Sequence, residues 1–352
     1  MEWLITTFGD SGALALIGAG VGVLFGITAQ QSQFCLRAST VEVAQRQPGP
    51  RLSVWLLAFF TALTLVQFAT AFGMLDLSQS RALSSAGSMS GAMIGGLMFG
   101  AGMILARGCA SRLLVLASCG NLRALVSGLV VTLVAQSAYR GVLSPTREAI
   151  AGLWTIPGGV DRDLTAGLGL SPMIVAVAAL LGLGASVLFA LRNRVALWRI
   201  ATGAGVGIAV MLGWALTYWI AQTSFEVVPI SSVTFTGPST DTLMVLVTQP
   251  RVTPSFGIGL VPGVAVGAGG AALVARQWKL ERFGADTPME RYLVGAFLMG
   301  FGAMLAGGCA VGAGLSGGAA MSVTAWVAVF CMWVGALVTQ RMMGPRAVPV
   351  GA

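Results

Sequence analysis

Nine long apolar stretches determine what this chain can fold into. A helix that spans a bilayer needs about 20 mostly apolar residues, and each stretch comes close to that length. Only 9% of the 352 residues are charged, whereas soluble domains carry about 25%. The sequence therefore predicts an all-α polytopic membrane protein and excludes a soluble enzyme, a disordered chain and a fibrous protein. The stretches cover roughly 12–29, 53–74, 89–106, 123–139, 172–190, 201–221, 257–275, 292–306 and 322–340.

The residue types that are present exclude several chemistries. The chain has no histidine, which removes the commonest general base and the commonest metal ligand. The net charge of +8 is typical of basic cytoplasmic loops in a membrane protein rather than of nucleic-acid binding. We expect no catalytic residue, no metal and no cofactor. Five cysteines without a CxxC pair favour free thiols over a disulfide framework, and they are Cys35, Cys109, Cys119, Cys309 and Cys331.

Two segments that lie 200 residues apart repeat each other. Residues 96–110 read GLMFGAGMILARGCA and residues 296–310 read AFLMGFGAMLAGGCA, with seven identities. The string GAGVG occurs both at 18–22 and at 203–207. The chain is therefore expected to consist of two related halves.

The helix count predicts how the two halves are related. Four spans in each half, separated by one linking span, place the second half upside down relative to the first, as in many transporters. The short segments 107–121 and 307–320 are expected to be re-entrant or broken helices. We expect a first membrane repeat in 1–140, an outer loop and linking helix in 141–200, and a second, inverted repeat in 201–352, together forming an hourglass-like passage.

The placement of arginine and lysine predicts the orientation of the chain. Nine crossings put 15 of the 20 basic residues on one side, which the positive-inside rule assigns to the cytoplasm. The N-terminus is then outside and the C-terminus inside. The sequence begins with Met1, Glu2 and Trp3 and lacks the basic n-region of a signal peptide, so we expect no cleavable signal peptide. The 15 are Arg37, Arg46, Arg51, Arg107, Arg112, Arg123, Arg192, Arg194, Arg199, Arg276, Lys279, Arg282, Arg291, Arg341 and Arg346, and the other five are Arg81, Arg140, Arg147, Arg162 and Arg251.

The repeated pairs Gly108–Cys109 and Gly308–Cys309 are the first candidates for a binding site. A glycine lets the backbone approach a substrate closely, and a half-helix that begins at the cysteine would direct free N–H groups at an anion. The alternative is that each cysteine is a small apolar residue in tight packing. Duplication at a repeat interface favours the binding site, because transporter sites lie at such interfaces.

A polar stretch before Cys35 is the second candidate. Gln33 and three other polar residues precede Phe34 and Cys35, and polar residues in a membrane protein more often face its interior than lipid. Ordinary helix-end polarity is the alternative. Arg107 and Arg112 flank Cys109 and would either attract an anion or only set the topology. Cys119 and Cys331 lack the glycine context and are assigned to packing.

These motifs resemble the YeeE/YedE family of sulfur-transport membrane proteins. The resemblance rests on GxGMxLAxGCAS around Cys109, GFGAMLAGGCAVGAGLSGG around Cys309, QxxxFCLRAS around Cys35 and FTGPSTDTLM at 235–244. It implies a bacterial inner-membrane protein that takes up thiosulfate or a similar small sulfur anion. Cys35, Cys109 and Cys309 would line its central passage, supported by Gln33, Arg107, Gly108, Arg112 and Gly308. The text GCASRLLVLASCG departs from the family's GCTSGHG-like text by lacking a histidine.

A relay of thiols suits such an ion. A neutral thiol is a weak hydrogen-bond donor, and conduction needs several weak sites in series. Cys309 would be the outer site, Cys109 the middle one and Cys35 the cytoplasmic one. The partners are then the sulfur anion, membrane lipid and, through the family, a cytoplasmic TusA-like sulfurtransferase. The alternative is a membrane thiol enzyme or scaffold that transfers sulfur with that sulfurtransferase, although an enzyme would need a resolving cysteine nearby.

Overall fold

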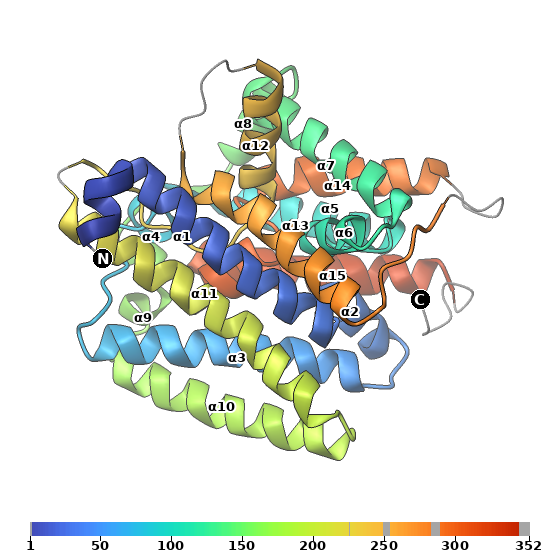
Figure 1. Ribbon diagram of the computed structural model, residues 1–352, viewed down its shortest axis with the longest axis horizontal. Coiled ribbons are helices and arrows are strands. Elements are labelled where there is room, and N and C mark those ends of the chain that lie inside the picture. Colours follow the sequence, from blue (N-terminus) through green and yellow to red (C-terminus); the bar gives the residue numbers. More distant parts are fainter. Residues whose placement is uncertain (1, 225, 249–253, 283–288, 345–352) are drawn as a thin grey trace.

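The computed structural model describes residues 2–224, 226–248, 254–282 and 289–344 (Figure 1). Arg251 and Arg346, which entered the orientation argument, lie outside these residues. Every one of the nine apolar stretches forms a helix. These helices are α1 (Glu2–Ser32), α3 (Pro50–Ala71), α5 (Met89–Leu105), α7 (Leu122–Arg140), α10 (Pro172–Arg192), α11 (Leu197–Thr223), α13 (Phe256–Val274), α14 (Met289–Leu305) and α15 (Val323–Met342).

Shorter elements connect the long helices. β1 and β2 pair antiparallel, with Gly87 opposite Ile156 and Ser88 opposite Thr155. Residues 107–121 and 307–320, expected to be broken helices, contain α6 and the π-helix η2, and neither is long enough to span a bilayer. The short elements are α2 (Leu36–Ala44), α4 (Arg81–Ser84), β1 (Gly87–Ser88), α6 (Ala110–Ser118), α8 (Ser144–Ala151), β2 (Thr155–Ile156), the 3-10 helix η1 (Val160–Arg162), α9 (Leu164–Gly167), α12 (Thr236–Thr248) and η2 (Gly312–Gly317).

Eight segments of the described chain are long and apolar enough to cross a membrane. The eighth expected span, 292–306, forms α14, of which the structure describes 17 residues, too few to be counted among the eight. α5 also has 17 residues. It counts as one of the eight membrane-spanning segments only when α6 is included, as the segment Met89–Ser118. A helix of this length is about 25 Å long at 1.5 Å per residue, which is shorter than a hydrocarbon core of about 30 Å. The chain is an all-α polytopic membrane protein, as predicted.

The helices α5 and α14 pack against each other through glycine residues. A Cβ at Gly95 would lie 2.6 Å from the carbonyl oxygen of Gly302, and a Cβ at Gly302 would lie 2.7 Å from that of Gly95. Gly102 and Gly295 show the same reciprocal contact, at 2.6 and 2.7 Å. The helices therefore run antiparallel with their backbones touching, a packing that small residues permit in membranes.

Other helix pairs also occur in matched sets. α5 packs on α15 and α14 packs on α7, while α1 packs on α13 and α11 packs on α3. α1 and α11 run antiparallel, since Thr28 contacts Gly205 and Asp10 accepts a hydrogen bond from Ser224. Two inverted repeats would produce this pairing, and the inverted repeat with its divisions near residues 140 and 200 remains our proposal. α10, the expected linking helix, lies at the edge of the bundle beside α3 (Figure 1).

The glycine contacts generate a stability prediction. A Cβ at Gly100 would lie 2.9 Å from the backbone nitrogen of Ala336, and one at Gly300 would lie 2.6 Å from the carbonyl oxygen of Val131. Because backbone cannot move aside cheaply, Gly100→Ala and Gly300→Ala should each lower the free energy of unfolding by about 1–3 kcal/mol. Thermal unfolding of the purified protein in detergent measures this. Gly184→Ala on α10 is the control, because a Cβ there meets nothing within 4 Å; equal melting of all three variants would contradict the packing.

Candidate functional site

The duplicated Gly–Cys segments share one backbone turn. After α5 the chain turns through Arg107 at φ 57°, and after α14 it turns through Gly307 at φ 77°. The N–H of Gly108 then returns to the carbonyl of Met103 at 3.1 Å, and the N–H of Gly308 returns to that of Ala303 at 2.9 Å. Left-handed backbone is natural for glycine and uncommon for arginine. The turn is therefore a fixed feature of both copies, and in the first copy it carries a charged side chain.

Cys109 follows this turn and lies beside Cys35. Cys109 is the N-cap of α6 and Cys35 is the N-cap of α2, both with extended backbone. Their side chains are close enough to influence each other's charge, and both are free thiols. The Sγ of Cys109 also lies 3.3 Å from the hydroxyl of Ser111. The structure thus brings together two thiols that are 74 positions apart in the sequence.

The thiol of Cys35 opens onto a cavity of about 370 Å³, which we call the basic cavity. Its lining comes from α2, α3, the turn after α5, α6, the start of α7 and α14. The cavity contains Gln33, two carboxylates and five arginines. The charged residues are Arg37, Arg51, Arg107, Arg112, Arg123, Glu42 and Glu281.

Several of these guanidinium groups keep free N–H donors. Among the described residues, Nε of Arg37, Nη1 of Arg112 and Nε of Arg123 are buried without a hydrogen-bond partner. Leaving a buried charged donor unpaired costs several kcal/mol more than pairing it, on the order of the desolvation of the group. The arrangement is therefore suited to an anion, which would supply the missing acceptors.

Arg51, Arg107 and the Nη2 atom of Arg123 contact specific partners. Arg51 donates from Nη1 to the side-chain oxygen of Gln33 at 2.6 Å. The guanidinium carbon of Arg107 lies 5.9 Å from the centre of the Tyr292 ring, a cation–π distance. Arg123 lies 3.8 Å from Glu281. Only the contact of Arg123 with Glu281 is an ion pair, so the five arginines of the cavity remain in excess over its two carboxylates.

Glu42 does not pair with an arginine side chain. Its carboxylate accepts hydrogen bonds from the backbone N–H groups of Gly49, Arg51 and Leu52, at 3.0, 3.0 and 2.9 Å. These groups belong to the N-terminus of α3, where a negative charge is stabilised. Glu42 therefore fixes α2 against α3 and leaves the neighbouring arginines available.

The glycines before the cysteines are explained by local packing. A Cβ at Gly108 would lie 3.2 Å from the side chain of Leu113, and one at Gly308 would lie 3.0 Å from the backbone nitrogen of Ala313. Each glycine thus lets the following helix begin close to the turn. Their part in the site is to position the cysteine thiols.

Cys309 lies at a separate place and has different neighbours. It is 1% exposed, and its Sγ accepts a hydrogen bond from the N–H of Gly312 at 3.5 Å. The hydroxyl of Thr234 lies 4.0 Å from the same sulfur. Thr234 is held there because Ser316 in η2 donates to the carbonyl of Val233 at 2.6 Å. The structure therefore pairs Cys309 with a segment before α12.

The sequence did not single out several of these residues. Glu42 and Tyr292 do not belong to any recognised motif. Thr234 is distant from Cys309 in the sequence and lies near it only in the folded chain. From the sequence, Arg37 and Arg51 are assigned to the topology alone. Arg37 stands two positions after Cys35, and this nearness is a signal that could have identified it. Tertiary contacts across distant segments are required for the rest.

The other two cysteines are packing residues. Cys119 lies between α6 and α7, its thiol points to the carbonyl of Ala268 at 3.9 Å, and burial raises the pKa of this thiol. Cys331 on α15 packs against the backbone of α5, since a Cβ placed at Gly96 would lie 2.8 Å from the Cβ of Cys331. Neither thiol lines the basic cavity.

Comparison with known proteins covers nearly the whole chain. A thiosulfate transporter, TsuA, of Escherichia coli (strain K12) is 25% identical over 351 residues, which is 92% of this chain and 93% of that protein. The TsuA protein of Spirochaeta thermophila is 28% identical over 329 residues, 88% of this chain and 93% of that protein. A family model described as sulphur transport matches residues 31–338, which include Cys35, Cys109 and Cys309. The chain therefore belongs to the sulphur transport family, as a transporter and not an enzyme.

Proposed function

We propose that the protein takes up thiosulfate, or a similar small sulfur anion, across the bacterial inner membrane into the cytoplasm. The observation that carries the proposal is the thiol of Cys35, which lies beside the buried Cys109 and opens onto the basic cavity. Two relatives that cover most of the chain are named thiosulfate transporters. Soft thiols and free guanidinium donors at one point suit an ion with a sulfur end and a charged oxygen end.

The mechanism divides the ion's recognition between two kinds of group. Thiols of Cys309, Cys109 and Cys35 give weak hydrogen bonds to the sulfur atom, so that none of them holds the ion tightly. Arginines in the basic cavity then attract the doubly charged oxyanion end. Several weak sites in series followed by a wider charged region favour entry and release alike.

The three cysteines that would line the proposed passage are closely packed. Cys35, Cys109 and Cys309 are 8%, 0% and 1% exposed. An ion could reach them only if neighbouring side chains moved, which fits a relay of discrete sites better than an open pore.

We place the basic cavity at the cytoplasmic end, following the positive-inside rule. Cys309 is then the outer site, and the ion reaches Cys109 and Cys35 after it. This end is also where we propose that a TusA-like sulfurtransferase in the cytoplasm receives the anion. Transport of labelled thiosulfate into proteoliposomes that contain only this protein tests the function: label should accumulate inside chemically unchanged, and protein-containing vesicles that match empty ones would refute uptake by this chain.

Replacement of Cys309 tests the relay directly. Cys309→Ala removes one weak donor and should cost about 1 kcal/mol of stability or less, with normal insertion. Uptake should nonetheless nearly stop, because one missing site interrupts the series. Cys309→Ser keeps a hydroxyl of similar size but a harder, better hydrated one, and we expect it to be strongly impaired too.

The matched control is Cys331→Ala, which changes a packing thiol and should transport normally. Uptake rates are compared at equal amounts of membrane-inserted protein. Wild-type uptake by both Cys309→Ala and Cys109→Ala would show that the thiols do not relay the ion.

Arg112 tests the role of the basic cavity. Its buried Nη1 has no partner among the described residues, so we expect it to bind the anion as a planar donor. Arg112→Lys should raise the KM for thiosulfate about 10- to 150-fold, since a lost charge-assisted hydrogen bond is worth roughly 1.5–3 kcal/mol. Arg282→Lys, in an exposed loop of the same predicted side, is the control for topology. Equal KM values for the two variants would remove Arg112 from the site.

The orientation is tested with reporters at the C-terminus. A green fluorescent protein fused there should fluoresce and an alkaline phosphatase should be inactive, because both report a cytoplasmic end. The opposite pattern would reverse the assignment of the basic cavity to the cytoplasmic side.

A further inference from the structure

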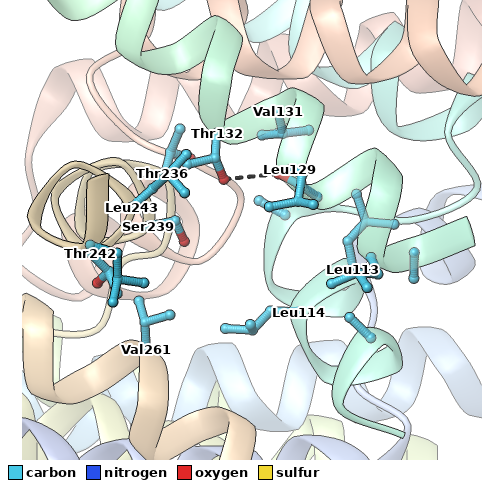
Figure 2. Close-up of a pocket in the computed structure, with 16 residues that line it drawn as sticks. Leu113, Leu114, Leu129, Val131, Thr132, Thr236, Ser239, Thr242, Leu243 and Val261 are labelled. Carbon is cyan, nitrogen blue, oxygen red and sulfur yellow. Dashed lines mark hydrogen bonds between the residues drawn. The ribbon is translucent and has the colours of Figure 1, made fainter. Parts of the chain in front are cut away.

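A second cavity, of about 180 Å³, separates α12 from α6. Both helices pack on α7 and α13, so the space between them is bounded on the remaining sides. We call this cavity the lateral groove. In Figure 2 the labelled α12 residues Ser239, Thr242 and Leu243 lie across an open space from Leu113 of α6. The apolar side chains that define it include Leu113, Leu114, Leu129, Leu243, Leu246 and Val261.

The lateral groove faces the surroundings of the helix bundle. Leu125 and Leu129 on one wall are 44% and 45% exposed, and Leu246 on the other wall is 78% exposed. α7 and α13 belong to the segments apolar enough to cross a membrane, so the medium at this surface is the bilayer. The groove therefore opens towards lipid.

The wall chemistry excludes the transported ion. All 16 lining residues are uncharged, and a divalent anion would lose its hydration there without compensation. The hydroxyls of Thr132 and Thr242 are bonded to carbonyls of their own helices, at 2.9 and 2.7 Å. The buried hydroxyl of Thr236 has no hydrogen-bond partner among the described residues. A hydrocarbon chain matches such a surface.

Cationic groups stand at one end of the lateral groove. Leu113 and Ala124 line both the groove and the basic cavity. Arg123 directly precedes Ala124, and its Nε is unpartnered. Next to it, Asn121 is bonded to Glu281 in a loop that carries Lys279 and Arg282. A phosphate at this end would meet positive charge.

We propose that the lateral groove holds an acyl chain of a membrane phospholipid, whose phosphate lies at the Arg123 end. The chain fills the space between α12 and α6 and restores contacts that the walls of an empty groove would lack. Because Cys109 caps the N-terminus of α6, the lipid also steadies the helix that positions this thiol. The site is independent of whether thiosulfate is the transported ion.

Gly128 offers a way to fill the groove with protein atoms. It lines the groove, and the nearest heavy atom to a Cβ placed there is the Cβ of Leu113, at 3.9 Å. Gly128→Leu therefore extends into the groove without displacing backbone. Gly184→Leu is the matched control, because a Cβ at this exposed α10 position meets nothing within 4 Å. Ser239→Leu fills the groove from the opposite wall and replaces Gly128→Leu if that variant does not fold.

The experiment uses vesicles of phosphatidylethanolamine and phosphatidylglycerol, in which the phosphatidylglycerol carries a diazirine on its acyl chain. After illumination, labelled peptides are identified by mass spectrometry. Wild type and Gly184→Leu should be labelled within 110–117 and 236–246 as well as on α10. The groove-filling variant should lose the label in the first two segments and keep it on α10.

Two results would overturn the proposal. One is a wild-type protein that is labelled on α10 but not in the groove; cross-links between two copies through α12 would then identify a second chain as the occupant. The other is groove labelling that Gly128→Leu and Ser239→Leu leave unchanged, because the acyl chain would then contact only the outer rim. Both results can be read without any transport measurement.

Discussion

Direct backbone contact between α5 and α14 is the constraint on which the rest of this structure depends. In a bilayer, apolar side chains gain little by leaving lipid for protein, so helices associate where small residues allow their backbones to touch. Gly95, Gly102, Gly295 and Gly302 provide that contact in reciprocal pairs. A side chain at any of them would push the two helices apart, and with them the segments that follow each helix.

The C-terminal ends of these two helices lead directly to the site. α5 ends at Leu105 and α14 ends at Leu305, and after each end the chain turns into a Gly–Cys segment. In a membrane interior such irregular backbone is tolerated only where it is buried in protein or lines a passage. The same turn holds Arg107 after α5 and Gly307 after α14. Each turn is followed by a cysteine, and only the first turn carries a charged side chain.

Hydropathy and glycine patterns were sufficient to predict the long helices. α5, expected at 89–106, covers Met89–Leu105, and α13, expected at 257–275, covers Phe256–Val274. Such boundaries follow from local composition, which the sequence displays. The sequence predicted nine spans, whereas eight segments of the described residues are long enough, because only 17 residues of α14 are described.

The site was predictable only in part, for a physical reason. Cys35, Cys109 and Cys309 stand in recognisable motifs, whereas their neighbours depend on how separate helices pack. The contact of Cys35 with Cys109 joins α2 to α6, and the contact of Thr234 with Cys309 joins a loop to η2. No periodicity within one segment encodes a contact between two segments. The lateral groove is invisible in the sequence for the same reason, since its walls come from four helices.

Glu42 shows how such packing determines the electrostatics of the site. A carboxylate beside several arginines would ordinarily form ion pairs and cancel their charge. Here three backbone N–H groups at the start of α3 occupy its oxygens, while the uncharged amide of Gln33 is the acceptor for Arg51. The negative charge is thus used to fasten α2, which carries Cys35, and the donors of Arg37 and Arg112 stay free. The same contact that positions the thiol therefore also preserves the positive charge that an anion needs beside it.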